Sequence, residues 1–267
     1  MTVKQLGLPE LVAHCVRLGI TAVGLWREPV RAYGVEAAAA LVHDAGLTVT
    51  SLCRGGFFTA DGREADNRAA VDEAAALGTD TLVLVSGGLP AGSRDLPAAR
   101  ARIADGIAAL APYAAERGVR LAIEPLHPMY AADRCAVSTL DQALDLAAPF
   151  PAEQVGVVVD TYHVWWDDRA PAAVARAGAE GRLHSFQLAD WTTPLPAGVL
   201  TGRGQLGEGA IDLAHWCELA LAAGHTGPVE VELFNDDLWA RDGLEVLEET
   251  LSAFGKITPR IGATLSG

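Results

Sequence analysis

The chain has 267 residues, of which half are hydrophobic, and a formal net charge of −14 at pH 7. This length suits a single α/β barrel domain with a large core, and we take residues 1–267 as one domain. The negative charge is not offset by any local cluster of Lys or Arg, which argues against a nucleic acid partner. No run of about 18 uncharged apolar residues is present, which argues against a membrane span.

Four widely spaced cysteines and the N-terminus bear on the compartment. The cysteines form no Cys-x-x-Cys pair, a pattern typical of reduced thiols rather than of a disulfide framework or a zinc ribbon. The first residues lack the basic, apolar and small-residue succession of a signal peptide. We therefore expect a cytoplasmic protein.

Apolar β-type runs alternate along the chain with alanine-rich segments of helical spacing. The predicted strands are Ala22–Trp26, Thr48–Cys53, Thr81–Ser86, Arg120–Glu124, Val155–Asp160, Leu183–Leu188 and Val229–Phe234. The predicted helices are Leu8–Leu18, Val35–Ala45, Asp66–Leu77, Pro97–Arg117, Thr139–Ala147, Pro171–Ala177, Asp212–Ala223 and Gly243–Phe254. This alternation predicts parallel strands covered by helices, hence a (β/α)8 TIM barrel, with a doubly wound open sheet as the alternative.

The strand count is one short of eight, and the missing strand is the first. Only "MTVKQL" precedes the first helix, a segment too short and too polar for a typical buried strand. Either Val3–Leu6 serves as a minimal first strand, or the true start lies upstream of Met1 and this chain is an incomplete barrel. We favour the second interpretation.

Four consecutive strands end in metal-type ligands. "LAIEP" ends in Glu124, "VGVVVD" ends in Asp160, and "SFQLAD" carries Gln187. In "VEVELF" Glu230 and Glu232 point the same way, and we favour Glu232 because it lies nearer the C-terminal end, where barrel active sites lie. A single acid at a strand end is often only a helix cap. Four together need a cation, because buried like charges repel.

Three carboxylates and one amide oxygen make an oxygen-only site. Such a site suits one divalent ion, Mn²⁺ or Mg²⁺. Zinc is less suited, for want of a set of histidine or cysteine ligands.

Several motifs together resemble a known family. They are "LAIEPLHPMYAADRCAVSTL", "VVVDTYHVWW", "FQLADW", "GEGAIDLAHW" and "GHTGPVEVELFND". From about Leu8 onward the chain is similar to the xylose-isomerase-like TIM-barrel superfamily, in particular to its sugar phosphate isomerases/epimerases, whose relatives include hydroxypyruvate isomerase and the ketose 3-epimerases.

The resemblance implies a role for each strand-end residue. Glu124, Asp160 and Glu232 match the family's metal ligands, and Gln187 matches the third ligand in the His-x-Gln form of hydroxypyruvate isomerase. His184 is out of phase with Gln187 and faces the other side of the strand.

The residues around these ligands bear on the substrate. His163 matches a histidine that contacts substrate oxygens in the family. At Tyr130 the ketose 3-epimerases have a second glutamate, which puts 3-epimerase activity in doubt. Other candidates for substrate binding near the strand ends are His127, Arg54, Arg203 and Trp191.

The predicted site suggests a reaction. A divalent ion polarises a carbonyl and stabilises the cis-enediolate that forms when an adjacent proton leaves, while Glu124 and Glu232 act as base and acid. We expect an isomerase or epimerase of a small sugar, sugar phosphate or hydroxy-keto acid, able to form a homo-oligomer. The alternatives are a lyase or dehydratase acting on a keto-sugar or keto-cyclitol, and an incomplete barrel with weak or no activity alone.

One further motif is a decoy. "GRGQLG", from Gly202 to Gly207, satisfies the dinucleotide-binding pattern G-x-G-x-x-G, but a proline-broken loop precedes it where the pattern requires a strand. We expect this loop to cover the site instead.

Overall fold

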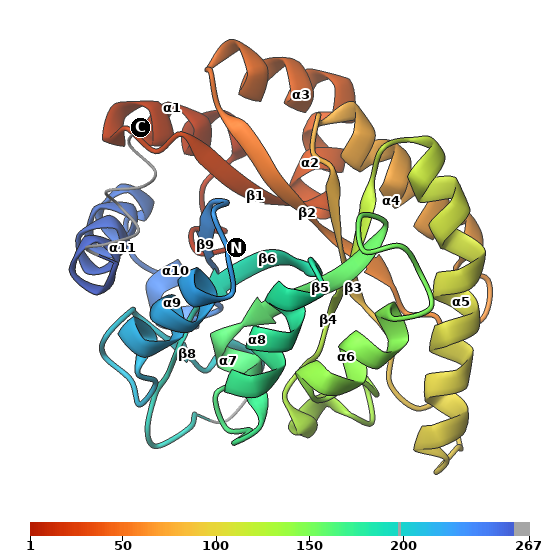
Figure 1. Cartoon of the computed structure of the whole chain (residues 1–267). Helices are drawn as coiled ribbons and strands as arrows, with labels where there is room; N and C mark the ends of the chain where they lie inside the picture. The colour runs from red at the N-terminus through yellow and green to blue at the C-terminus, as the bar shows by residue number, and fades with distance from the viewer. Residues whose placement is uncertain (197–198, 259–267) are drawn as a thin grey trace.

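The computed structural model describes residues 1–196 and 199–258, with helices packed around a central parallel sheet (Figure 1). The end of the predicted domain, residues 259–267, lies outside the described residues. Neighbouring strands pair in chain order, β1-β2-β3-β4-β5-β6-β9, and every pair is parallel. This order differs from that of a doubly wound sheet and confirms the barrel prediction. The strands are β1 Ala22–Trp26, β2 Thr48–Gly56, β3 Thr81–Val85, β4 Arg120–Glu124, β5 Val155–Asp160, β6 Leu183–Leu188 and β9 Val229–Val231.

The main helices lie where the spacing predicts them, to within a few residues at each end. They are α1 Leu8–Leu18, α3 Val35–Asp44, α4 Glu64–Ala76, α5 Leu96–Glu116, α6 Leu140–Ala147, α8 Ala170–Ala179, α9 Leu213–Ala222 and α11 Gly243–Ile257. The short elements at the strand ends were not predicted, because one or two turns carry no clear period. They are α2 Arg27–Tyr33, α7 Thr161–Val164, α10 Asp236–Trp239, the 3₁₀ turns η1 Pro128–Tyr130 and η2 Val199–Thr201, and the hairpin of β7 Asp190–Trp191 with β8 Arg203–Gly204.

Local chemistry sets the limits of these helices. Helix α1 is capped by Gly19, whose φ of 70° lets its own N–H reach the Val16 carbonyl and the N–H of Ile20 reach the Cys15 carbonyl. Helix α5 begins where the carboxylate of Asp95 accepts a hydrogen bond from the N–H of Ala98. Such signals at both ends explain why the sequence predicts the long helices well.

The alternation of side chains along each strand creates two apolar layers. One layer fills the space between sheet and helices, and the other lies inside the barrel and consists of Cys53, Val83, Ala122 and Val158, with Trp26 packed against them. Because side chains alternate, Glu124 and Asp160, each two residues beyond an interior residue, also face the interior. The sheet thus directs these two carboxylates to the centre of the barrel at its C-terminal end.

The sheet is open between β9 and β1, since no pairing joins them within the described part of the chain. Val3–Leu6 forms turns, so the interpretation of this segment as a minimal strand is wrong. A cavity of about 230 Å³ lies at the opening, between α1 and α11 on the outside and Glu230 and Glu232 on the inside.

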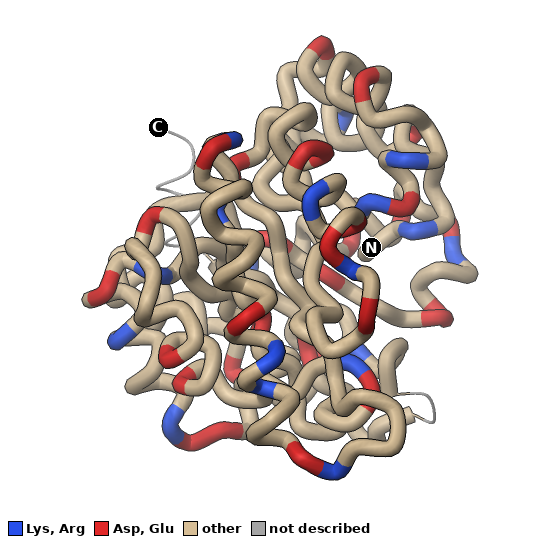
Figure 2. Tube along the Cα trace, turned by 90° about the vertical axis from the view of Figure 1, so that its right-hand side faces the viewer, with Lys and Arg blue, Asp and Glu red and all other residues tan. Residues whose placement is uncertain are grey.

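The outer surface carries charges of both signs. Figure 2 shows basic and acidic residues interspersed over the outer helices. Among the residues that the structure describes, no helix is both long enough and apolar enough to cross a membrane.

Candidate active site

Three buried side chains meet at the C-terminal end of the barrel. Glu124 at the end of β4, Asp160 at the end of β5 and His163 in α7 place one potential ligand atom each within 4.8 Å of one another. Asp160 also begins α7, because its Oδ1 accepts a hydrogen bond of 2.9 Å from the N–H of Tyr162. The cap leaves Oδ2 directed to the cluster. The sequence predicts both acids as metal ligands and His163 as a residue that contacts the substrate, and the structure brings the three side chains together.

Arg203 is the cation of this cluster. Its Nη1 lies 2.7 Å from Oε2 of Glu232 and 3.1 Å from Oδ2 of Asp160, and it also donates to the Glu232 carbonyl at 2.8 Å. The side chain is buried and reaches the site from the short hairpin that β8 forms with β7. The sequence predicts that Arg203 lies in a loop and binds the substrate. In the structure its guanidinium is instead paired with the protein's own carboxylates, those of Asp160 and Glu232.

Burial and mutual repulsion disturb the titration of the acids. Burial raises the pKa of Glu124 well above its usual range, and the nearby Asp160 and Glu232 raise it further. Burial also raises the pKa of Asp160, to about 6, against the opposing effect of Arg203. The surroundings therefore do not fully stabilise the ionised forms of Glu124 and Asp160.

The residues fit a divalent metal ion. Oδ2 of Asp160 is buried and has no hydrogen-bond partner in the described residues. Three carboxylates, those of Glu124, Asp160 and Glu232, face the single guanidinium of Arg203. Counted in their ionised forms, they leave two formal negative charges, which one divalent ion would balance.

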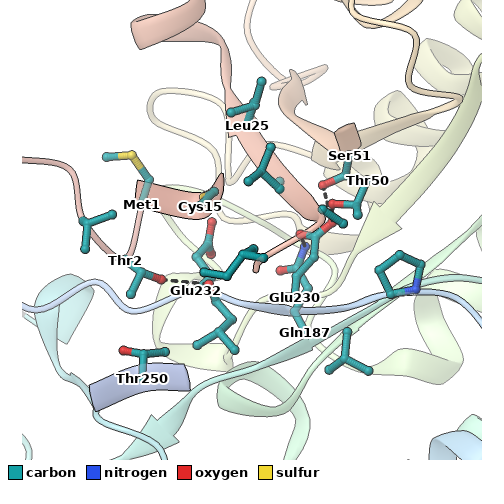
Figure 3. Close-up of a pocket in the computed structure, with 18 of the residues that line it drawn as sticks. Met1, Thr2, Cys15, Leu25, Thr50, Ser51, Gln187, Glu230, Glu232 and Thr250 are labelled. Atoms are coloured by element: carbon teal, nitrogen blue, oxygen red, sulfur yellow. Dashed lines mark hydrogen bonds between the residues drawn. The ribbon is translucent and has the colours of Figure 1, made fainter. Parts of the chain in front are cut away.

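Gln187 lies on β6 beside Asp160, and a hydrogen bond to Glu230 orients its side-chain amide. Its Nε2 donates to Oε2 of Glu230 at 3.0 Å, while its Oε1 accepts no hydrogen bond from the residues described. Glu230 in turn accepts from the hydroxyls of Thr50 at 2.6 Å and Ser51 at 2.7 Å, as Figure 3 shows. With its NH₂ group fixed, the amide keeps its oxygen free for a ligand.

Glu232 is held on both oxygens. The indole N–H of Trp26 donates to Oε1 at 2.8 Å, and Arg203 holds Oε2. Glu124, by contrast, receives no side-chain hydrogen bond within the part of the chain that the structure describes. The two candidate proton carriers thus have different surroundings, one fixed and one free.

His163 is a neutral imidazole that lies between two N–H donors. Burial lowers its pKa well below the usual range. N–H donors approach both ring nitrogens, the backbone N–H of His127 at 3.2 Å from Nδ1 and Nη2 of Arg203 at 3.1 Å from Nε2. A neutral imidazole accepts through only one nitrogen. The ring can therefore accept from only one of these two donors at a time, and its Nε2 faces Arg203 and Asp160.

Aromatic rings form the wall beside the cluster. Trp191 lies with its ring centre 5.0 Å from both His127 and Tyr162. The hydroxyls of Tyr130 and Tyr162 both donate to the Val199 carbonyl, at 3.0 and 2.9 Å. The predicted rim residues His127 and Trp191 therefore lie together, and the tyrosines tie the covering loop to them.

Arg54, the remaining predicted rim residue, lies on the side of the barrel where β1 and β2 end. Its guanidinium carbon is 5.3 Å from the ring centre of Trp26 and 4.8 Å from that of Phe57. Its nearest carboxylate, that of the mostly exposed Glu28, is 3.8 Å away.

The sequence gives no account of Asp190, which organises the loop after β7. Its carboxylate accepts hydrogen bonds from the backbone N–H groups of Trp191, Gly207, Gly209 and Ile211. Of the glycines in "GRGQLG", Gly207 thus helps to close the loop around a buried acid, and the motif follows the 3₁₀ turn η2 where the dinucleotide pattern requires a strand. His184 binds the Ala152 carbonyl at 2.8 Å, away from the cluster, which agrees with its predicted phase.

The fold is a TIM barrel with acidic side chains at the C-terminal ends of its strands, and comparison with known proteins identifies the family. Residues 12–250 match the family model described as xylose isomerase-like TIM barrel. The chain belongs to this family. The crystal structure of protein SMc04130 from Sinorhizobium meliloti 1021 superposes with a TM-score of 0.92 at 46% identity, over 96% of this chain and 95% of that chain. The name of that protein states no activity.

Two curated relatives have named activities. A 3-dehydroshikimate dehydratase from Pseudomonas aeruginosa is 33% identical over 201 residues, and an inosose isomerase from Bacillus velezensis is 30% identical over 142 residues. These alignments cover 69% and 51% of this chain but only 30% and 48% of the two relatives, so the chain spans less than half of either. The IolI protein, solved with bound zinc, has the same fold at 18% identity, with a TM-score of 0.79 over 94% of this chain and 92% of that chain.

Proposed function

We propose that this protein is a divalent-metal-dependent isomerase or epimerase that moves a proton on the carbon next to a carbonyl group of a small hydroxy-ketone. The observation that carries the proposal is the cluster of the buried Glu124 and Asp160 with the partly buried Glu232, whose three formal negative charges exceed the one positive charge of Arg203 by two and would be balanced by a single divalent ion.

The ion would be held by Glu124, Asp160, Glu232 and the free oxygen of Gln187. When bound, it would polarise the substrate carbonyl and stabilise the negative charge that develops on it. The oxygen-rich donor set favours Mn²⁺ or Mg²⁺, and the zinc in IolI makes Zn²⁺ a third candidate.

The protein's own side chains would have different roles in the proton transfer. The carboxylate of Glu124 accepts no hydrogen bond from the residues that the structure describes and has a raised pKa, so it suits the group that takes a proton and returns it. Glu232, fixed by Trp26 and Arg203, would serve on the other side of the substrate. His163 would contact a substrate oxygen, and the ring wall of Trp191 and Tyr162 would exclude water.

A dehydratase is the second candidate. It shares the first proton removal but then expels a hydroxyl group as water instead of returning the proton. Of the two curated relatives, the 3-dehydroshikimate dehydratase aligns with more residues of this chain than the inosose isomerase does, which favours this alternative.

The test is turnover in heavy water with the metal-loaded protein, using a panel of ketoses, keto acids, inosose and 3-dehydroshikimate. An isomerase or epimerase returns a deuterium-labelled isomer of unchanged composition, whereas a dehydratase yields a product lacking one water. Metal analysis after saturation with Mn²⁺ accompanies the assay, with Glu124→Gln and Glu232→Gln as comparison. If the wild-type protein binds no divalent ion, the proposal fails.

A further inference from the structure

The arginines near the C-terminal end of the barrel differ in how far their hydrogen-bonding capacity is used. Arg203 is occupied by Asp160 and Glu232. Arg27 is buried and occupied as fully, by the carboxylates of Asp66 at 2.9 Å and Glu73 at 2.7 Å. The charge of each guanidinium is therefore already compensated by two of the protein's own carboxylates.

Arg54 is different. Its Nε is buried and has no hydrogen-bond partner in the described parts of the chain, a feature that it shares with Arg63, but unlike Arg63 it has no described carboxylate within hydrogen-bond distance. Its contact with Glu28 is 3.8 Å long, and the Glu28 side chain is 66% exposed, so solvent screens this pair. A buried donor without an acceptor costs free energy that a ligand can recover.

The surroundings of Arg54 fix its orientation. The guanidinium lies over the rings of Trp26 and Phe57, and its backbone carbonyl accepts a hydrogen bond of 3.1 Å from Arg27. Phe57 has a φ of 51°, which is uncommon for a residue other than glycine and is found preferentially at functional sites. Stacking on rings leaves the edge of a guanidinium open, and that edge matches the two oxygens of a carboxylate.

Trp26 connects Arg54 to the proton-transfer site. The same indole that lies beside the guanidinium donates its N–H to Glu232. One indole ring therefore separates the Arg54 charge from the Glu232 carboxylate. A ligand about the size of one six-membered ring can place a carbonyl at the inner cluster and an anionic group at Arg54.

We propose that Arg54 binds a carboxylate of the substrate, so that the substrate is a small cyclic hydroxy-ketone bearing an acid group rather than an uncharged keto-cyclitol. This inference rests on the proposed function for the carbonyl end of the ligand. The inner cluster offers no charge for the acid group, because Arg203 and a divalent ion together balance the three carboxylates.

The experiment compares wild type, Arg54→Gln and Arg54→Lys, each loaded with Mn²⁺, and measures both calorimetric binding and turnover. The probes are 3-dehydroshikimate, which carries a carboxylate, and inosose, which carries none. The matched control is Arg63→Gln, since Arg63 lies over the same Phe57 ring but is already paired with Asp66 at 2.7 Å.

Loss of a charge-assisted, two-pronged hydrogen bond should weaken binding of the acid roughly tenfold to a hundredfold in Arg54→Gln. Arg54→Lys should recover part of the loss, Arg63→Gln should change little, and binding of inosose should stay within about twofold in all variants. Weakening of both probes alike by Arg54→Gln, or binding of inosose but not of the acid by wild type, overturns the inference while leaving the proposed function standing. Binding of the acid through Arg54 without turnover of any ketone rejects the proposed function and supports the role of Arg54.

Discussion

The Nη1 atom of Arg203 lies 3.1 Å from Oδ2 of Asp160, yet that oxygen has no hydrogen-bond partner in the described residues. The pair is a contact of charges without the alignment of a hydrogen bond, because Glu232 takes the better-aligned interactions of the same nitrogen. Asp160 therefore keeps an oxygen with unused capacity, which is the property of a metal ligand before binding.

Replacement of Arg203 should destabilise the metal-free protein most. Arg203→Gln leaves buried carboxylates without their counter-ion, for which we expect a loss of about 3–5 kcal/mol in the free energy of unfolding. Saturating Mn²⁺ should recover much of this loss, because the ion supplies the missing charge. Thermal or urea unfolding with and without Mn²⁺ measures both values. The exposed Arg17→Gln serves as the control, with an expected loss below about 1 kcal/mol; equal losses for Arg203→Gln with and without metal would contradict the counter-ion role.

The stability of the metal-free protein should fall with rising pH through Asp160. Its native pKa is raised from 3.8 to about 6, so between these values the native state holds a proton that the unfolded state has released. The contribution is present below about pH 4 and is lost as pH rises through about 6. On the order of 3 kcal/mol is involved, and the raised pKa of Glu124 extends the trend upward.

The measurement compares wild type with Asp160→Asn in urea unfolding at several pH values. Asp66 and Asp80 have lowered pKa values and oppose the trend as pH falls, so the difference between the two proteins is the quantity to follow. The difference should grow in favour of the variant from pH 4 to pH 7, and Mn²⁺ should reverse it. A difference independent of pH would refute the shifted titration of Asp160.

Glu230 should set the metal affinity without being a ligand. Glu230→Gln removes the charge that holds the Nε2 of Gln187, so the amide can turn its nitrogen toward the ion, and we expect binding of Mn²⁺ to weaken about 10–100-fold. Thr50→Val is the matched control, because it removes one neighbour of Glu230 but leaves Ser51 and the contact with Gln187 in place. Calorimetry or Mn²⁺ EPR reports the affinity. A lower melting temperature with unchanged affinity would assign Glu230 a structural role alone.

The sequence predicts the features that depend on neighbouring residues or on a regular spacing of side chains. The alternation on β4 and β5 is enough to place Glu124 and Asp160 inside the barrel, and the glycine ends of the helices are enough to separate the βα units. The contacts that Arg203 and Tyr130 make in the structure do not follow from either kind of pattern. The first enters the cluster from a two-residue hairpin strand, and the second binds Val199, 69 residues away, so nothing in their neighbourhood in the sequence signals these contacts.

Tyr130 and Tyr162 should hold the covering loop jointly. Both hydroxyls donate to the one carbonyl of Val199, and a buried hydrogen bond of this kind contributes about 1 kcal/mol. Tyr130→Phe and Tyr162→Phe should each lower the free energy of unfolding by about that much. The loss in the double variant should differ from the sum of the two single losses, because the two hydroxyls share an acceptor.

The same variants also test whether the loop belongs to the site. If the loop covers the substrate, each should raise KM more than it lowers kcat, since the loop is loosened while Glu124 and Glu232 are untouched. The control is Tyr113→Phe, whose hydroxyl binds the exposed Asp72 on the outer face. Additive stability losses with an unchanged KM would show that the tyrosines tie down a loop that the substrate does not meet.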